Sequence, residues 1–181
     1  MKPIRFVRMI AKSSVCAAVI VMLLAPAAQA ATATGTFQVL IEIQKSCSVT
    51  AGAGSDINLG TVASTASAAS NDTISVTCTK GTPYYIGLAP SVANGGNDSG
   101  LGSMASSTGA THGDKVPYQL RSAAGAAGTI WGNTATTSSA GNGVAATGTG
   151  AAQSHTVYAT VASANYTADS YADTVTVTVN Y

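Results

Sequence analysis

The stretch that decides the fold is Thr174-Val175-Thr176-Val177-Thr178-Val179-Asn180-Tyr181. Apolar and polar residues alternate through it with a period of two, which is typical of a β-strand with one buried face. Valine and threonine are both good strand formers, so propensity agrees with pattern. The stretch therefore predicts a strand that turns one row of side chains toward the core: Val175, Val177, Val179 and Tyr181.

The same alternation recurs along most of the chain. A second regular run places four apolar residues on one face: Phe37, Val39, Ile41 and Ile43. Shorter alternating runs occur at 73–78, 84–88, 118–121 and 156–161. No window carries the apolar stripe of a helix. Many short strands separated by turn residues predict an all-β, antiparallel β-sandwich.

Turn chemistry separates these runs. Asn94-Gly95 and Asn142-Gly143 supply residues that favour tight turns. Three stretches rich in Ala, Gly, Ser and Thr are predicted to be loops of the same domain: 63–70, 122–128 and 134–152.

The first thirty residues have the pattern of a secretory signal peptide. A basic start that includes Lys2 and Arg5 is followed by the apolar run Val15 to Leu24 and by Ala28-Gln29-Ala30. A membrane anchor is the alternative, but the apolar run is shorter than the roughly 18–20 residues that span a bilayer. The sequence therefore predicts export, with residues 1–30 removed.

The charge that remains after residue 30 argues against nucleic acid as a partner. Four of the eight basic residues lie in the predicted signal peptide, which leaves four basic residues against seven acidic ones. No basic patch remains to attract phosphates, so we expect no nucleic-acid binding.

The cysteines predict one disulfide bond. Cys16 lies in the predicted signal peptide, which leaves Cys47 and Cys78 in an exported chain. Two cysteines in an oxidising compartment most simply pair with each other. A two-cysteine metal or redox site is the alternative, but there is no Cys-x-x-Cys and no histidine near either residue.

No arrangement of residues points to catalysis. His112 and His155 are the only histidines, and both lie among small polar residues. Asp98-Ser99-Gly100 lacks the flanking pattern of a serine nucleophile, and no phosphate-binding or metalloprotease motif occurs. We therefore expect no enzyme, no cofactor and no metal. Aromatic residues such as Trp131 and Tyr158 leave a sugar-binding platform open as an alternative to ordinary packing.

The two most regular runs raise the question of strand exchange between chains. An unpaired alternating strand recruits other chains through its free edge, and strand addition is an established recognition mode. Ordinary edge strands within one complete sandwich have the same pattern, so pattern alone leaves both interpretations open.

A series of segments that runs nearly from end to end of the chain distinguishes between them: 35–39, 46–49, 57–61, 74–78, 117–121, 130–133, 156–158 and 171–181. In these segments the chain resembles the spore coat protein U domain and, within it, the subunits of archaic chaperone–usher pili of the Csu type.

The resemblance implies an incomplete immunoglobulin-like β-sandwich that is completed by a donor strand from a chaperone or a neighbouring subunit. It implies that residues 31–45 form the donor segment, with Phe37, Val39, Ile41 and Ile43 entering the neighbour, and that residues 46–181 form the sandwich. The strand with Val175, Val177, Val179 and Tyr181 would border the acceptor groove. The expected partners are identical or related pilus subunits, a periplasmic chaperone and an outer-membrane usher.

The expected function is that of a structural pilus subunit, exported through the periplasm to the cell surface for adhesion and biofilm formation. A non-polymerising secreted coat protein and a carbohydrate-binding module are the alternatives.

Overall fold

The computed structural model describes residues 30–181 except residue 53. The predicted signal peptide lies outside the described residues apart from its last position, Ala30. The described elements are β1 (Cys47–Thr50), β2 (Ala68–Cys78), β3 (Pro83–Pro90), the 3₁₀ turn η1 (Val92–Asn94), β4 (Leu101–Ser106), β5 (Lys115–Arg121), β6 (Val144–Thr147), β7 (Ala152–Val161), β8 (Tyr171–Ala172) and β9 (Val175–Asn180).

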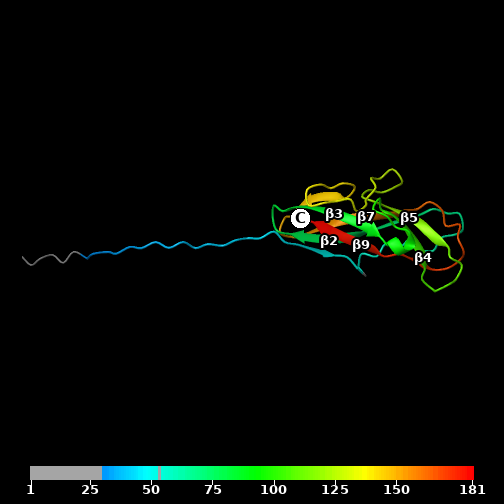
Figure 1. The fold of residues 1–181 in the computed structure, drawn as a ribbon, viewed down its shortest axis with the longest axis horizontal. Coiled ribbons are helices and arrows are strands. Elements are labelled where there is room, and N and C mark those ends of the chain that lie inside the picture. Colours follow the sequence, from blue (N-terminus) through cyan, green and yellow to red (C-terminus); the bar gives the residue numbers. More distant parts are fainter. Residues whose placement is uncertain (1–29, 53) are drawn as a thin grey trace, which may run out of the picture. The chain divides into compact units, whose positions relative to one another are not determined.

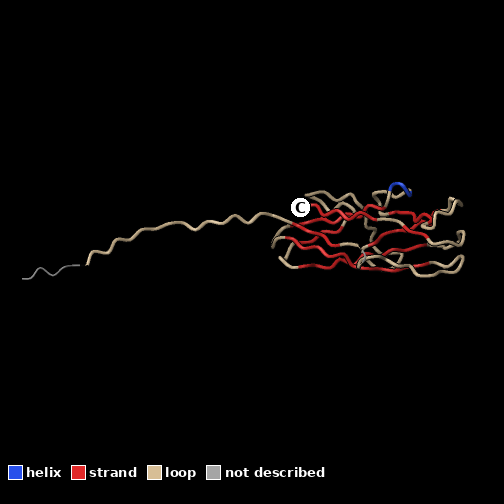
Figure 2. Tube along the Cα trace, turned by 90° about the horizontal axis from the view of Figure 1, so that it is seen from below, coloured by secondary structure: helices blue, strands red, loops and turns tan. Residues whose placement is uncertain are grey.

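These strands form two antiparallel sheets. The larger sheet has the order β1-β2-β7-β5-β4-β8, and the smaller sheet has the order β6-β3-β9. The strands of both sheets run lengthwise along the domain (Figures 1 and 2). The predicted all-β, antiparallel sandwich is therefore confirmed.

The core lies between the sheets. The larger sheet contributes Val76, Leu120 and Val157, and β3 contributes Tyr84, Ile86 and Leu88, all of them buried. Trp131 is also buried, and its indole Nε1 donates to the backbone oxygen of Ile86 at 2.9 Å. Burial of Trp131 and Tyr84 removes both side chains from any sugar-binding platform on the surface.

Two segments predicted to be loops contain strand. β2 begins at Ala68, within the predicted loop 63–70, because its ladder with β7 runs from Ala68↔Val161 to Thr77↔Ala152. β6 lies within the predicted loop 134–152 and pairs with β3. In both cases a stretch that contains small residues adopts the strand conformation because a neighbouring strand offers its backbone groups.

The predicted disulfide is present. Cys47 and Cys78 are bonded, and they are also opposite each other in the β1–β2 ladder. The bond ties the short edge strand β1 to its neighbour β2 in the larger sheet.

Removing this bond should destabilise the domain strongly. The disulfide closes a loop with a sequence separation of 31 residues, and such a loop stabilises the fold by roughly 3–4 kcal/mol in the chain-entropy model. We expect Cys47→Ala with Cys78→Ala to lower the free energy of unfolding by about that amount in urea titrations. Thiol titration of the unreduced, denatured parent should find no free thiol, and two free thiols would contradict the pairing.

His155 lies on β7. Its Nε2 is 2.9 Å from the hydroxyl of Tyr84, and the two rings meet edge to face. Burial lowers the pKa of His155, because a charged imidazolium would be poorly solvated beside the core. The native state therefore favours neutral His155.

This burial makes stability depend on pH. An unfolded histidine has a pKa of about 6.5, so below that pH the unfolded state binds a proton more readily than the native state does. We expect the melting temperature to decrease from pH 7.5 to pH 5.5 and His155→Gln to reduce that decrease. Tyr84→Phe, which removes the hydroxyl but leaves the imidazole, should retain most of it. An equal decrease in the parent and in His155→Gln would contradict this assignment.

Candidate functional site

The smaller sheet leaves the core incompletely covered along β9. β9 pairs with β3 on one side, from Tyr85↔Asn180 to Pro90↔Val175, and it is an edge strand on the other. Ile86 and Leu88 on β3 are 0% and 1% exposed. The three valines that β9 turns toward the same core are only half-buried: Val175, Val177 and Val179.

A second extended segment faces the same core without forming a strand. Within residues 56–61, Ile57 and Leu59 are half-buried against the core, whereas Asp56, Asn58 and Gly60 are exposed. β1, the edge strand of the larger sheet, lies close to β9. We use the term β9 groove for the partly covered surface of β9 formed by Val175, Val177 and Val179.

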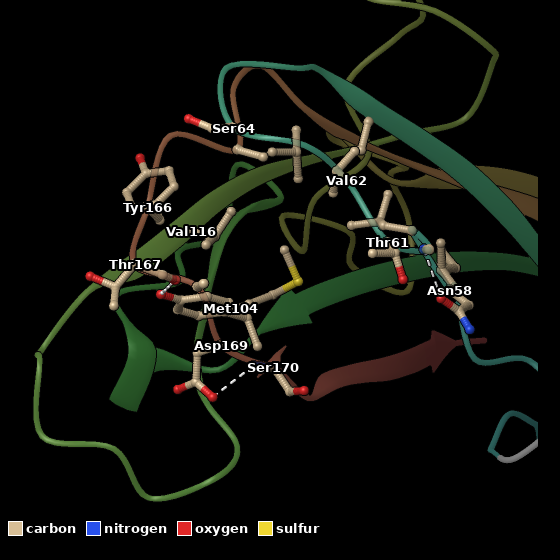
Figure 3. Close-up of a pocket in the computed structure, with 18 of the residues that line it drawn as sticks. Asn58, Thr61, Val62, Ser64, Met104, Val116, Tyr166, Thr167, Asp169 and Ser170 are labelled. Carbon is tan, nitrogen blue, oxygen red and sulfur yellow. Dashed lines mark hydrogen bonds between the residues drawn. The ribbon is translucent and has the colours of Figure 1, made fainter.

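Beside Ile57 and Leu59 is a cavity of about 730 Å³. Its apolar lining includes Ile57, Leu59, Met104, Val116, Val161 and Tyr171. Figure 3 shows Met104 between the chain that carries Asn58 to Ser64 and the chain that carries Thr167 to Ser170. The cavity is open to solvent, and its lining combines these apolar side chains with polar residues such as Asn58, Thr61 and Ser64.

Asp173 fixes the beginning of β9. Its carboxylate accepts from the Tyr118 hydroxyl at 2.7 Å and from Asn94 Nδ2 at 2.7 Å. Gly102 leaves the space for Tyr118, because a Cβ at this position would overlap the phenol ring. Burial and the bond to Asp173 raise the pKa of Tyr118, so its proton stays in place. β9 is therefore anchored by β3 and by Asp173 although its outer edge is free.

Polar residues hold the cavity's outer rim. The Asp169 carboxylate accepts from Ser106 Oγ at 2.5 Å and from Thr108 Oγ1 at 2.7 Å, and it contacts His112 Nε2 at 3.1 Å. These bonds hold the pKa of Asp169 well below its usual range, and the bond from Ser106 has the largest effect on that pKa. Asp114 likewise accepts from the Thr167 hydroxyl and backbone amide, which lowers its pKa.

The predicted donor residues carry exposed apolar side chains. Residues 30–46 contain no helix or strand. Phe37, Val39, Ile41 and Ile43 are 88%, 86%, 86% and 75% exposed. Apolar side chains exposed in an alternating row are unusual in a soluble protein and typical of an interaction surface.

The site residues predicted from the sequence have different surroundings in the structure. Val175, Val177 and Val179 lie together in the β9 groove, whereas Tyr181 is 47% exposed. The sequence analysis did not assign Met104, Asp169 or Asp173 to the site, and it included Ile57 and Leu59 only within a matching family segment. The alternation of Ile57 and Leu59 was the available signal for their role.

The β9 groove offers the free backbone edge of β9 and apolar side chains. Among the described residues, no three His, Cys, Asp or Glu side chains are grouped to hold a metal ion. Of the helices in this part of the chain, none is long and apolar enough to cross a membrane. The arrangement is suited to accept an extended strand, which could pair with β9 and cover the half-buried valines.

Comparisons with known proteins agree with this fold. The family model for the Spore Coat Protein U domain matches residues 33–178. A chain in the crystal structure of the CsuC–CsuE chaperone–tip adhesion subunit pre-assembly complex, from archaic chaperone-usher Csu pili of Acinetobacter baumannii, is similar with 23% sequence identity and a TM-score of 0.51. The match covers 77% of this chain and 40% of that chain, so the present chain spans less than half its length. No curated protein matches the chain.

Proposed function

Because this chain belongs to the Spore Coat Protein U domain family, we propose that it is a structural subunit of a chaperone–usher pilus that polymerises by donor-strand exchange. The observation that carries the proposal is the β9 groove, where an edge strand and three half-buried valines lack a covering partner among the described residues. A donor strand would supply both the missing ladder and the missing apolar cover.

The dimensions of donor and acceptor agree. β9 contains six residues, and at about 3.4 Å per residue it spans roughly 20 Å. Phe37 to Ile43 spans a similar length when extended. Each apolar side chain that becomes fully buried contributes about 1.5–3 kcal/mol, so four such side chains together with backbone bonds would make a durable joint.

In this proposal residues 31–45 act on the next subunit and residues 46–181 form the acceptor sandwich. A periplasmic chaperone covers the β9 groove before assembly, and an outer-membrane usher is the place of exchange. After signal peptide removal and export, the polymer would lie on the cell surface, where it would serve adhesion and biofilm formation. The solved relative, a chaperone–subunit complex of Csu pili, supports the choice of a chaperone as partner.

The family description also favours a second candidate, a secreted coat protein that does not polymerise. The two functions predict different bands when the unheated protein is run in denaturing gel electrophoresis. A pilus subunit produced with its chaperone and usher should give a ladder of multimers, whereas a coat protein of this kind should give monomer only.

The donor segment should be dispensable for folding of its own subunit. We expect a variant that lacks residues 31–44 to accumulate in the periplasm with its chaperone, because its core does not use those residues. A synthetic peptide covering residues 34–45 should raise the melting temperature of this variant, since a ligand bound only by the native state stabilises it by mass action. The measurement is thermal unfolding with increasing peptide concentration.

A matched peptide with aspartate in place of Val39 and Ile41 is the control, because two charges in an apolar groove cost several kcal/mol (roughly 2–7 for each unpaired polar group). If the truncated chain fails to fold with the chaperone present, or if the parent peptide leaves its melting unchanged, the donor-strand function is wrong.

A charge in the groove should prevent capture by the chaperone. We expect Val177→Asp to eliminate the chaperone–subunit complex from the periplasm, because the carboxylate would be desolvated on the core face of β9. Thr176→Asp is the matched control, since Thr176 is exposed on the opposite face of the same strand. Co-purification with a tagged chaperone measures both variants. Equal yields of complex would contradict the position assigned to the groove.

A further inference from the structure

The cavity beside Ile57 and Leu59 is bordered by two irregular segments, residues 56–64 and residues 162–170. Residues 162–170, which we call the arch, join β7 to β8 and contain no helix or strand. The arch contributes Ala164, Tyr166, Thr167, Ala168, Asp169 and Ser170 to the cavity lining. A movement of the arch would therefore change the size of the cavity.

The arch is tied to the β4–β5 hairpin through Asp169. This carboxylate bonds to Ser106 and Thr108 and contacts His112, all of which lie on the hairpin (Figure 3 shows Asp169 at the rim). Its side chain is only 9% exposed. Backbone pairing adds to this attachment, since the Ser107 amide donates to the Ser170 oxygen at 2.9 Å.

The other side of the arch is tied less strongly. Ser64 Oγ donates to Asn165 Oδ1 at 3.2 Å, and the Ala164 amide donates to the Ala66 oxygen at 2.8 Å. The turn that provides these partners contains Thr65 with a positive φ of 66°, a backbone conformation that is costly for a threonine.

Asp114 adds a second attachment to the hairpin, since its carboxylate accepts from the Thr167 hydroxyl at 2.6 Å and from the Thr167 amide at 3.0 Å. Among the described arch residues, Asp169 makes the most side-chain bonds to the hairpin.

The apolar part of the cavity lining lacks contacts that nearby side chains could supply, which favours closure of the cavity. Met104 on β4 and Tyr166 on the arch are among the side chains that line it. The ionised Asp169 opposes that closure, since its carboxylate loses its hydroxyl partners if it leaves the hairpin.

We propose that Asp169 is a positioning residue that holds the arch on the β4–β5 hairpin. It would thereby keep the cavity beside Ile57 and Leu59 open for the strand that pairs with β9. This inference rests on the proposed function, because it assigns a role in accepting the donor strand. Asp169 does not itself contact the strand in this role. Its effect is on the fraction of subunits that are ready to bind.

The test uses the full chain carrying Val39→Asp and Ile41→Asp, which disables its own donor segment but keeps the acceptor. A fluorescent peptide covering residues 33–45 is the probe, and its dissociation constant is measured by anisotropy. If Asp169→Ala leaves the cavity open about a tenth of the time, peptide affinity should decrease about tenfold, because only the open fraction binds.

Conservative variants distinguish positioning from loss of folding. Asp169→Asn keeps an oxygen that accepts from Ser106 or Thr108, so it should recover part of the affinity. Ser106→Ala with Thr108→Val removes the donors without changing charge and should reproduce most of the loss. Asp72→Ala is the matched control, because Asp72 bonds only to the adjacent Thr73 amide among the described side-chain contacts and should bind peptide like the parent.

Each outcome bears on a different statement. If the parent acceptor does not bind peptide, the proposed function fails and this inference fails with it. If the parent binds and Asp169→Ala binds equally well, the proposed function stands and the role of Asp169 is wrong. If all Asp169 variants lose affinity together with the near-ultraviolet circular dichroism of the folded core, Asp169 serves folding in general and the positioning role is wrong.

Discussion

The half-buried row of valines on β9 is the constraint on which the rest of the structure depends. A sandwich is stable when each sheet covers the apolar face of the other, and here three strands face six. β3 is well covered, with Ile86 and Leu88 fully buried, whereas Val175, Val177 and Val179 are not. The free edge of β9 leaves backbone groups unpaired at the same place. One extended segment would meet both needs.

Several features keep this incomplete surface in shape. The disulfide attaches β1 to β2, and Asp173 attaches the beginning of β9 to Tyr118 and Asn94. The arch is attached through Asp169. Each attachment includes a covalent or polar bond, and Cys78 and Tyr118 also belong to the buried core. Hydrogen bonds fix direction as well as distance, so these bonds hold the three elements in defined positions.

The parts of the fold that could be predicted from the sequence are those that depend on a local pattern or on the type of a single residue. The Val/Thr alternation of β9 and the two remaining cysteines fall in this class. β6 was missed because Val144–Thr147 is short and lies in a stretch of small residues, and its strand conformation comes from β3. Asp169 was missed for a related reason, since it meets Ser106 across 63 positions of the chain. Such contacts depend on the three-dimensional arrangement and leave no local pattern.

Phe37 to Ile43 and β9 have the same alternation, yet only β9 forms a strand. A period of two specifies a face, and a strand also requires a neighbour that supplies backbone partners. β9 has β3 as such a neighbour, whereas residues 30–46 have none that makes a ladder. The row of exposed side chains that includes Phe37 and Ile43 is costly in water. In the proposed function, that cost becomes a driving force for association with a groove of matching length on another copy.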